Sequence, residues 1–141
     1  TGAAFAIWQP DTHPGAGIVN EANTLCWNEL STRDVPAAAA FYEQVFGWKA
    51  VDQGGYTQWE LAGEAVGGMM ATPDMVPAEV PAHWMVYFAV DDTDATVAKA
   101  TELGGSVIVP AMDIEPGRFA TLADPTGAMF AVIKMKADLG A

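Results

Sequence analysis

The chain has 141 residues, of which 51% are hydrophobic, and this predicts one globular domain with a substantial core. Its 18 acidic and 6 basic residues give a net charge of −12, which repels phosphate backbones and anionic lipids, so neither nucleic acid nor a membrane is expected as a partner. The single thiol, Cys26, cannot form an intramolecular disulfide, which favours a cytoplasmic protein.

The first nine residues resemble a strand from near the end of the same chain. Thr1–Ile7 (TGAAFAI) nearly repeats Thr126–Val132 (TGAMFAV), so we expect residues 1–9 to form a strand equivalent to the last strand of a preceding repeat. Residues 10–23, rich in Pro, Gly and Asn, would then be a linker. This pattern predicts either a homodimer or a fragment of a tandem two-domain chain, although two small-residue strands could also match by coincidence.

Residues 24–71 are predicted to form a first βαβββ module. A strand at 24–31 is followed by Asp34 as a helix cap, a helix at 35–46, and Gly47 as its stop. Short β-prone stretches at 48–51, 56–61 and 65–71 complete the module, because Gly-rich turns separate them.

After a Pro-rich connector at 72–82, residues 83–134 repeat the same order, and 135–141 form a tail. The predicted elements are a strand at 83–90, a helix at 93–103 with Asp92 as its cap, and strands at 106–109, 118–122 and 128–134. Asp34 and Asp92 are 58 residues apart, as are Gly47 and Gly105, so a cap and a stop recur at one offset. This common offset indicates a duplicated unit.

Several short motifs together resemble one known family across residues 24–134. They are Trp27-Asn28-Glu29-Leu30 before Asp34, Phe46-Gly47-Trp48, Val90-Asp91-Asp92-Thr93, and Asp124-Pro125-Thr126-Gly127. With them the chain resembles the vicinal oxygen chelate superfamily, which includes glyoxalase I, extradiol dioxygenases and bleomycin-type resistance proteins, and most of all the second domain of actinobacterial two-domain members. The resemblance implies an α+β fold in which two βαβββ modules form a curved mixed sheet around a cleft.

The resemblance also locates the positions where metal-dependent members carry their ligands. In this chain they are Trp27, Met85, Ala131 and a position near Met70, none of which offers the imidazole or carboxylate donor that such metals need. We therefore expect no metal and no other cofactor.

Alternation of side chains along the strands extends this predicted site. The expected ligand contacts are Trp27, Trp59, Met70, Met85, Met129 and Ala131, and the polar residues that could act on a ligand are Glu29, His83 and Tyr87. The plainer interpretation is core packing for the aromatic and Met side chains, and a salt bridge or an exposed strand end for Glu29.

Three classes of function fit these residues. The leading hypothesis is metal-independent binding of a small hydrophobic, aromatic or planar molecule, as in drug-binding resistance proteins. The second is a metal-independent enzyme acting on a carbonyl or polyketide-like compound, with Glu29 and either Tyr87 or His83 as acid and base. The third is a metal-dependent lyase or dioxygenase with displaced ligands such as Glu29, His83 and Glu60. The residues leave open whether any reaction is catalysed.

Overall fold

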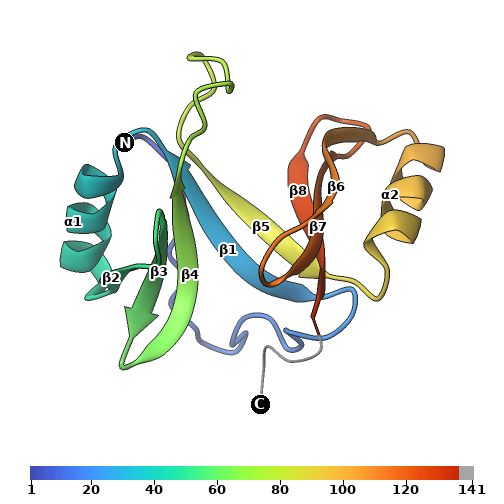
Figure 1. The fold of residues 1–141 in the computed structure, drawn as a ribbon. Helices are drawn as coiled ribbons and strands as arrows, with labels where there is room; N and C mark the ends of the chain where they lie inside the picture. The colour runs from blue at the N-terminus through green and yellow to red at the C-terminus, as the bar shows by residue number, and fades with distance from the viewer. Residues whose placement is uncertain (137–141) are drawn as a thin grey trace. The chain divides into compact units, whose positions relative to one another are not determined.

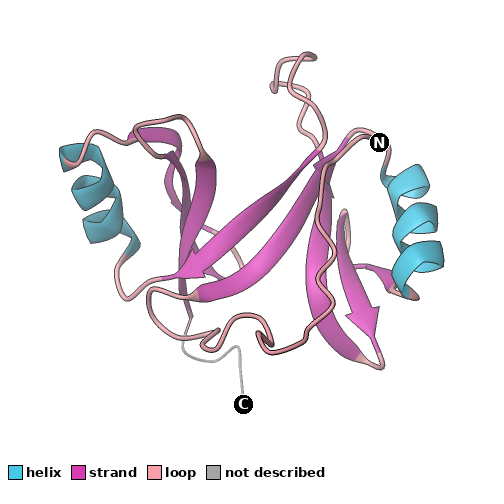
Figure 2. Ribbon diagram, turned by 180° about the vertical axis from the view of Figure 1, so that it is seen from behind, coloured by secondary structure: helices cyan, strands magenta, loops and turns pink. Residues whose placement is uncertain are grey.

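A computed structural model describes residues 1–136 and has the predicted α+β class (Figure 1). Within these residues, two helices accompany eight strands (Figure 2). The chain divides into two compact units, one formed by residues 1–9 and 27–85 and the other by residues 10–26 and those from 86 onward. The predicted tail at 135–141 lies outside the described residues from position 137.

The first unit is a four-stranded mixed sheet with one helix against it (Figure 1). Its elements are β1 (Leu25–Thr32), α1 (Val35–Phe46), β2 (Lys49–Asp52), β3 (Tyr56–Leu61) and β4 (Glu64–Ala71). The strand order is β2-β3-β4-β1, with β1 and β4 parallel and β3 antiparallel to both of its neighbours. The predicted βαβββ module is therefore confirmed, with strand ends shifted by one residue at most.

An aromatic core joins α1 to one face of this sheet. Tyr42 is its centre, because its ring lies 5.9 Å from Trp48, 5.6 Å from Trp59 and 5.3 Å from Trp84, measured between centroids. The Tyr42 hydroxyl also accepts a hydrogen bond of 2.9 Å from the Trp84 indole. Three of the five Trp residues thus serve packing, which agrees with the plainer interpretation for most of the aromatic residues.

The same topology is repeated by β5 (His83–Ala89), α2 (Thr93–Glu102), β6 (Ser106–Asp113), β7 (Gly117–Ala123) and β8 (Met129–Met135). The second unit contains these elements except for the first three residues of β5, which belong to the first unit. Its strand order is β5-β8-β7-β6, and β5 pairs with β8 in parallel as β1 does with β4. Leu122, Val132, Val90 and Ala120 form the core under α2. Arg118 of β7 holds Asp94 in the first turn of α2 through two hydrogen bonds of 2.7 and 2.9 Å.

Both helix caps recur at the predicted offset, but the left-handed glycine that ends the second helix lies one residue earlier than predicted. Asp34 accepts a hydrogen bond from the Ala37 N–H, and Asp92 accepts one from the Ala95 N–H, so both bonds keep the 58-residue offset. Gly47 ends α1 with a left-handed φ of 70°. In α2 the left-handed residue is Gly104, with a φ of 89°, and Gly105 is instead a close approach, where a Cβ would lie 2.9 Å from the Ala123 carbonyl oxygen.

The predicted strand at residues 1–9 is not formed. This segment has no regular secondary structure and is tied to the first unit by Phe5, whose ring lies 5.6 Å from that of Tyr42 and 5.8 Å from that of Phe46. A strand needs a free sheet edge, whereas a single aromatic side chain needs only the apolar surface that α1 offers. Residues 10–23, the predicted linker, are grouped with the second unit and contain no helix or strand.

The connector at 72–82 projects beyond the end of β4 (Figure 1) and is held at its base by Arg33. The guanidinium group donates hydrogen bonds to the carbonyl oxygens of Val80 at 2.7 Å, Pro77 at 2.9 Å and Val76 at 3.2 Å. A guanidinium group can donate several hydrogen bonds at once, so it suits a turn whose carbonyl groups are not bonded to a neighbouring strand.

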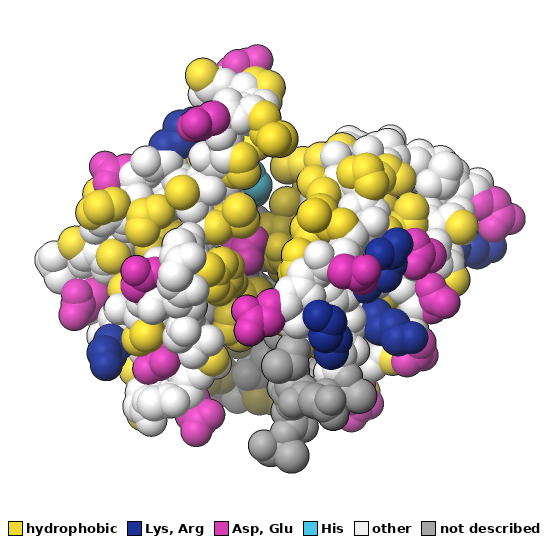
Figure 3. Space-filling view, viewed as in Figure 1, with side chains coloured by type: hydrophobic (Ala, Val, Ile, Leu, Met, Phe, Trp, Pro, Cys, Tyr) yellow, Lys and Arg dark blue, Asp and Glu magenta, His cyan; other side chains and the backbone are white. Residues whose placement is uncertain are grey.

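No described helix has the length and apolar character that a membrane span requires. On the face drawn in Figure 3, acidic side chains are scattered widely and basic ones are fewer, in keeping with the net charge of −12.

Candidate functional site

The candidate site lies on the face of the first unit's sheet that points away from α1. Leu30, Trp59 and Met69 pack against α1, so alternation places their strand neighbours on the opposite face. That face, called the site face below, carries Trp27, Glu29, Tyr56, Gly68 and Met70. By the same alternation around Trp84, which packs against Tyr42, His83 and Met85 also point away from α1.

Three side chains of the site face lie close together, those of Trp27, Tyr56 and Glu29. The Trp27 indole N–H donates to the Tyr56 hydroxyl oxygen at 2.9 Å. The Glu29 carboxylate lies close enough to the Tyr56 hydroxyl to raise the pKa of that hydroxyl. Because indole only donates, the Tyr56 hydroxyl is the acceptor in its hydrogen bond with Trp27.

Gly68 explains how the Tyr56 ring reaches these partners. In the sheet register Gly68 lies between Glu29 of β1 and Gln58 of β3, and Tyr56 is paired with Met70, two residues further along both strands. A Cβ at Gly68 would overlap the Tyr56 hydroxyl and would lie 3.0 Å from the Trp27 indole nitrogen. The missing side chain therefore lets the phenol lie directly over the backbone of β4.

The Tyr56 hydroxyl stays protonated in this environment. Burial raises the pKa of Tyr56 far above its ordinary value of 10.0, and the negative charge of Glu29 raises it further. The hydrogen bond from Trp27 acts in the opposite direction but is outweighed. Tyr56 is therefore a neutral hydroxyl group across the physiological pH range.

The four positions that the family resemblance marks for metal ligands bring no donor set together. Trp27, Met70 and Met85 are half-buried, and Ala131 has no exposed surface. Among residues 1–136, no group of three His, Cys, Asp or Glu side chains is arranged to hold a metal ion. The residues at these positions do not fit the family's metal, because indole, thioether and methyl groups are poor ligands for a hard cation.

Two predicted ligand contacts, Trp59 and Ala131, lie in the core. Trp59 is 0% exposed and packs against Tyr42, and Ala131 is 0% exposed beside Tyr87 and Thr121 in the register of β5, β8 and β7. Neither offers a surface that a ligand could contact, so we assign both to the core. Met129, which is 43% exposed, retains an accessible side chain.

The two other predicted polar residues lie on β5. The His83 Nδ1 is 2.9 Å from the Pro81 carbonyl oxygen, which ties this ring to the end of the connector. Tyr87 belongs to the second unit, is 9% exposed, and packs its ring 6.5 Å from that of Phe119. Their proposed part as acid or base alongside Glu29 stays a prediction.

The partner that sequence reasoning missed is Tyr56. Its signal was the pair Gly67-Gly68 inside an otherwise β-prone stretch, because glycine in a strand interior often marks a close approach by another group. The identity of the approaching group depends on the register of β3 against β4, which the sequence alone does not provide.

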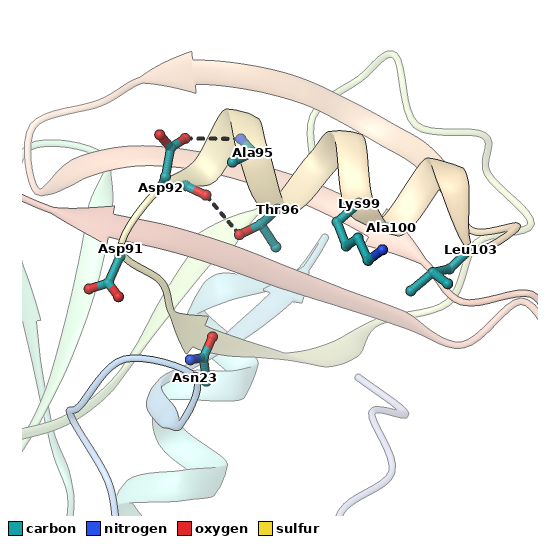
Figure 4. Close-up of a pocket in the computed structure, with 8 residues that line it drawn as sticks. All are labelled: Asn23, Asp91, Asp92, Ala95, Thr96, Lys99, Ala100 and Leu103. Carbon is teal, nitrogen blue, oxygen red and sulfur yellow. Dashed lines mark hydrogen bonds between the residues drawn. The ribbon is translucent and has the colours of Figure 1, made fainter.

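A separate open hollow of about 500 Å³ lies along α2 in the second unit (Figure 4). It is lined by Asn23, Asp91, Asp92, Ala95, Thr96, Lys99, Ala100 and Leu103. Two of the polar groups drawn there bond to the first turn of the helix, since Asp92 accepts from the Ala95 N–H and the Thr96 hydroxyl donates to the Asp92 carbonyl oxygen at 2.7 Å. None of the predicted site residues lines it.

Comparison with known proteins gives one family match. Residues 24–132 match the model of the Glyoxalase/Bleomycin resistance protein/Dioxygenase superfamily. The chain is 51% identical over 140 residues to "Putative glyoxylase CFP32" of Mycobacterium tuberculosis, an alignment that covers 95% of this chain and 52% of that protein. It is 40% identical over 139 residues to the anthracycline biosynthesis protein DnrV of Streptomyces peucetius, covering 96% of this chain and 50% of that protein. The chain therefore spans about half the length of these curated relatives.

A solved structure with the same fold is methylmalonyl-CoA epimerase from Mycobacterium tuberculosis, with a TM-score of 0.60, 15% identity, and coverage of 87% of this chain and 96% of that one. At this level of identity the likeness concerns the fold alone.

Proposed function

The chain belongs to the glyoxalase/bleomycin resistance protein/dioxygenase superfamily, and we propose that this member binds a small, largely apolar or planar organic molecule on its site face without a metal ion. The observation that carries the proposal is the replacement of the family's ligand positions by Trp27, Met70 and Met85, which are half-buried side chains. An indole and two thioethers make an adaptable apolar surface but a poor set of ligands for a hard cation.

The contacts around Trp27 support a binding role for its ring. The N–H is held by Tyr56, so the plane of the indole is fixed before a ligand arrives. A fixed aromatic plane favours stacking with a flat molecule. The similarity to proteins named for anthracycline biosynthesis supports a small organic compound, and not a macromolecule, as the ligand.

The test is equilibrium dialysis with 2-naphthol as a planar probe. Trp27→Ala should weaken binding about 10- to 100-fold, the usual effect of removing one aromatic anchor, whereas Trp27→Phe should retain most of the affinity because it keeps a ring. Trp8→Ala is the matched control, since Trp8 lies in the N-terminal segment and is 65% exposed. Unchanged affinity in Trp27→Ala would place the site elsewhere.

Elemental analysis tests the other half of the proposal. Protein purified without chelator should contain no stoichiometric divalent metal, and a chelator should leave its melting temperature unchanged. One equivalent of zinc, iron, nickel or manganese per chain would contradict metal-independent binding and support the displaced-ligand alternative.

A second candidate function is favoured by the position of the Glu29 carboxylate, which shares the site face with Trp27 and lies close enough to Tyr56 to raise its pKa. A carboxylate beside an aromatic side chain can act as a general base toward a proton next to a carbonyl group. The proton would pass to Glu29 while the electron pair moves to the carbonyl oxygen, and its return would complete exchange or epimerisation. In D₂O, the methyl protons of 2-acetylnaphthalene should then exchange faster with the protein than with Glu29→Gln, measured by NMR.

A further inference from the structure

We propose that Glu60, with Gln58 beside it, makes the site face selective for planar molecules that carry a protonated amino group. This inference rests on the proposed binding function and names the chemical class of its ligand. It depends on two side chains of β3 that the proposed function does not use, and on the strand that separates them from Trp27.

Gln58 and Glu60 lie on the same side of the sheet as Trp27. Trp59, between them on β3, packs against Tyr42 of α1, so alternation directs its two neighbours away from the helix. The irregular pairing beside Trp59 places its extra residue in β4, so the alternation of β3 is kept. Both side chains are half-buried.

The strand that separates Trp27 from Glu60 carries small side chains. β4 lies between β1 and β3, and its residue opposite Glu60 is Ala65. Further along β4, the Tyr56 phenol occupies the space over Gly68. Because neighbouring strands are about 4.8 Å apart, β1 and β3 are separated by roughly 10 Å, which a two-ring aromatic molecule with a short substituent can span.

The Glu60 carboxylate is held by one neutral side chain. Gln58 Nε2 donates a hydrogen bond of 3.2 Å to Glu60 Oε1, and this bond makes Gln58 a positioning residue because it restricts the rotamers of the carboxylate. Within residues 1–136 no basic side chain forms an ion pair with Glu60, although Lys49 is its register partner on β2. A carboxylate has about four acceptor sites and no proton to donate, so the complementary group on a ligand is a donor, and best a cationic one.

The selectivity concerns a cation against a neutral donor. An ammonium group and a hydroxyl group both donate hydrogen bonds, but the bond to a carboxylate is stronger when the donor is charged. The net charge of −12 attracts every cation to this protein, so the preference belongs to Glu60 only if it depends on that residue. Because Glu60 is half-buried, solvent screens part of the attraction, and we expect a preference of about five- to tenfold.

The experiment compares 2-naphthylmethylamine with 2-naphthylmethanol, which have the same ring and linker and differ in whether the donor is charged. Equilibrium dialysis near neutral pH with the wild-type chain should give about five- to tenfold tighter binding of the amine. Glu60→Gln should lose this preference and keep its affinity for the alcohol, because it removes the charge and keeps the shape. Gln58→Leu should reduce the preference without changing the affinity for the alcohol, since it leaves the carboxylate without its positioning partner.

The matched control is Glu64→Gln, which makes the same change in net charge at the exposed start of β4 and should keep the full preference. Circular dichroism of each variant verifies that it is folded. Equal binding of both probes by the wild type, a preference that survives in Glu60→Gln, or one that is also lost in Glu64→Gln would overturn the amino-group selectivity and leave the binding function standing. Binding of neither probe would overturn the binding function and this inference together.

Discussion

Gly68 is a residue whose lack of a side chain makes room for another group, the Tyr56 phenol. Glycine in a strand interior costs roughly 0.5–1 kcal/mol relative to alanine, because the unfolded chain gains freedom and the strand loses a side chain. At Gly68 that cost is offset by the Tyr56 phenol, which lies over the backbone and reaches Trp27 and Glu29. The residue is not in a left-handed conformation, so space alone is the reason for glycine here.

We therefore expect Gly68→Ala to lower the free energy of unfolding by about 1–3 kcal/mol, the usual range for overpacking. In a Tyr56→Ala background the same change should cost little, because the overlapping ring is gone. The measurement is a double-mutant cycle by urea denaturation, with a coupling energy of about 1 kcal/mol or more between the two sites. Additive effects would show that the ring and Gly68 do not share one space.

From the sequence, strand alternation predicts which side chains of one strand share a face, but not which residues of other strands they contact. Alternation predicts that Trp27 and Glu29 share one face, since they are two residues apart on β1. Trp59 was assigned to the ligand surface but fills the core, because a short strand with an irregularity beside Trp59 gives no clear inward face. Tyr56 was missed because its role depends on contacts among three strands.

At the scale of elements, local rules predicted more than the long-range ones did. Both helices begin at the expected Asp caps, because the cap and the residue it bonds are three positions apart. β6 was predicted to stop at residue 109, before Pro110, but it continues to Asp113 with two register shifts. It is the outer strand of its sheet, where proline is tolerated and irregular pairing is common.

A substitution of Arg33 tests whether this side chain holds the connector at 72–82 in place. Arg33→Ala removes three hydrogen bonds to backbone carbonyls and should make amide hydrogen exchange faster within 73–82, with little change in global stability. Arg33→Lys should rescue only part of the protection, because an ammonium group does not have the fork of donors that reaches three carbonyl groups. Unchanged exchange in Arg33→Ala would mean that the prolines hold the connector by themselves.

At the scale of the whole molecule, the duplication was the most useful feature of the sequence. The 58-residue offset predicted two equal modules, and both units have a parallel pair formed by their first and last strands. The resemblance between residues 1–7 and 126–132 was extended too far, since it predicted a strand where the structure has an irregular segment. Sequence similarity to a strand does not provide the partner edge that a strand requires.

The N-terminal segment nevertheless contributes to the folded state through Phe5, which is 41% exposed and contacts Phe41, Tyr42 and Phe46. Phe5→Ala should lower the free energy of unfolding by about 1–2 kcal/mol, less than for a fully buried ring. Deleting residues 1–9 should have a similar effect and leave the solution mass per particle unchanged apart from the missing residues. Ile7→Ala is the control, because Ile7 is 73% exposed and should change stability by less than about 0.5 kcal/mol.

Urea denaturation and light scattering on the same three variants separate the two arrangements that residues 1–9 could adopt. If Phe5 packs on α1 of its own chain, stability falls and the mass stays constant, because the contact is intramolecular. If the segment instead pairs with a second copy, deletion halves the mass and the stability loss depends on protein concentration. The contacts of Phe5 with three residues of α1 favour the first outcome.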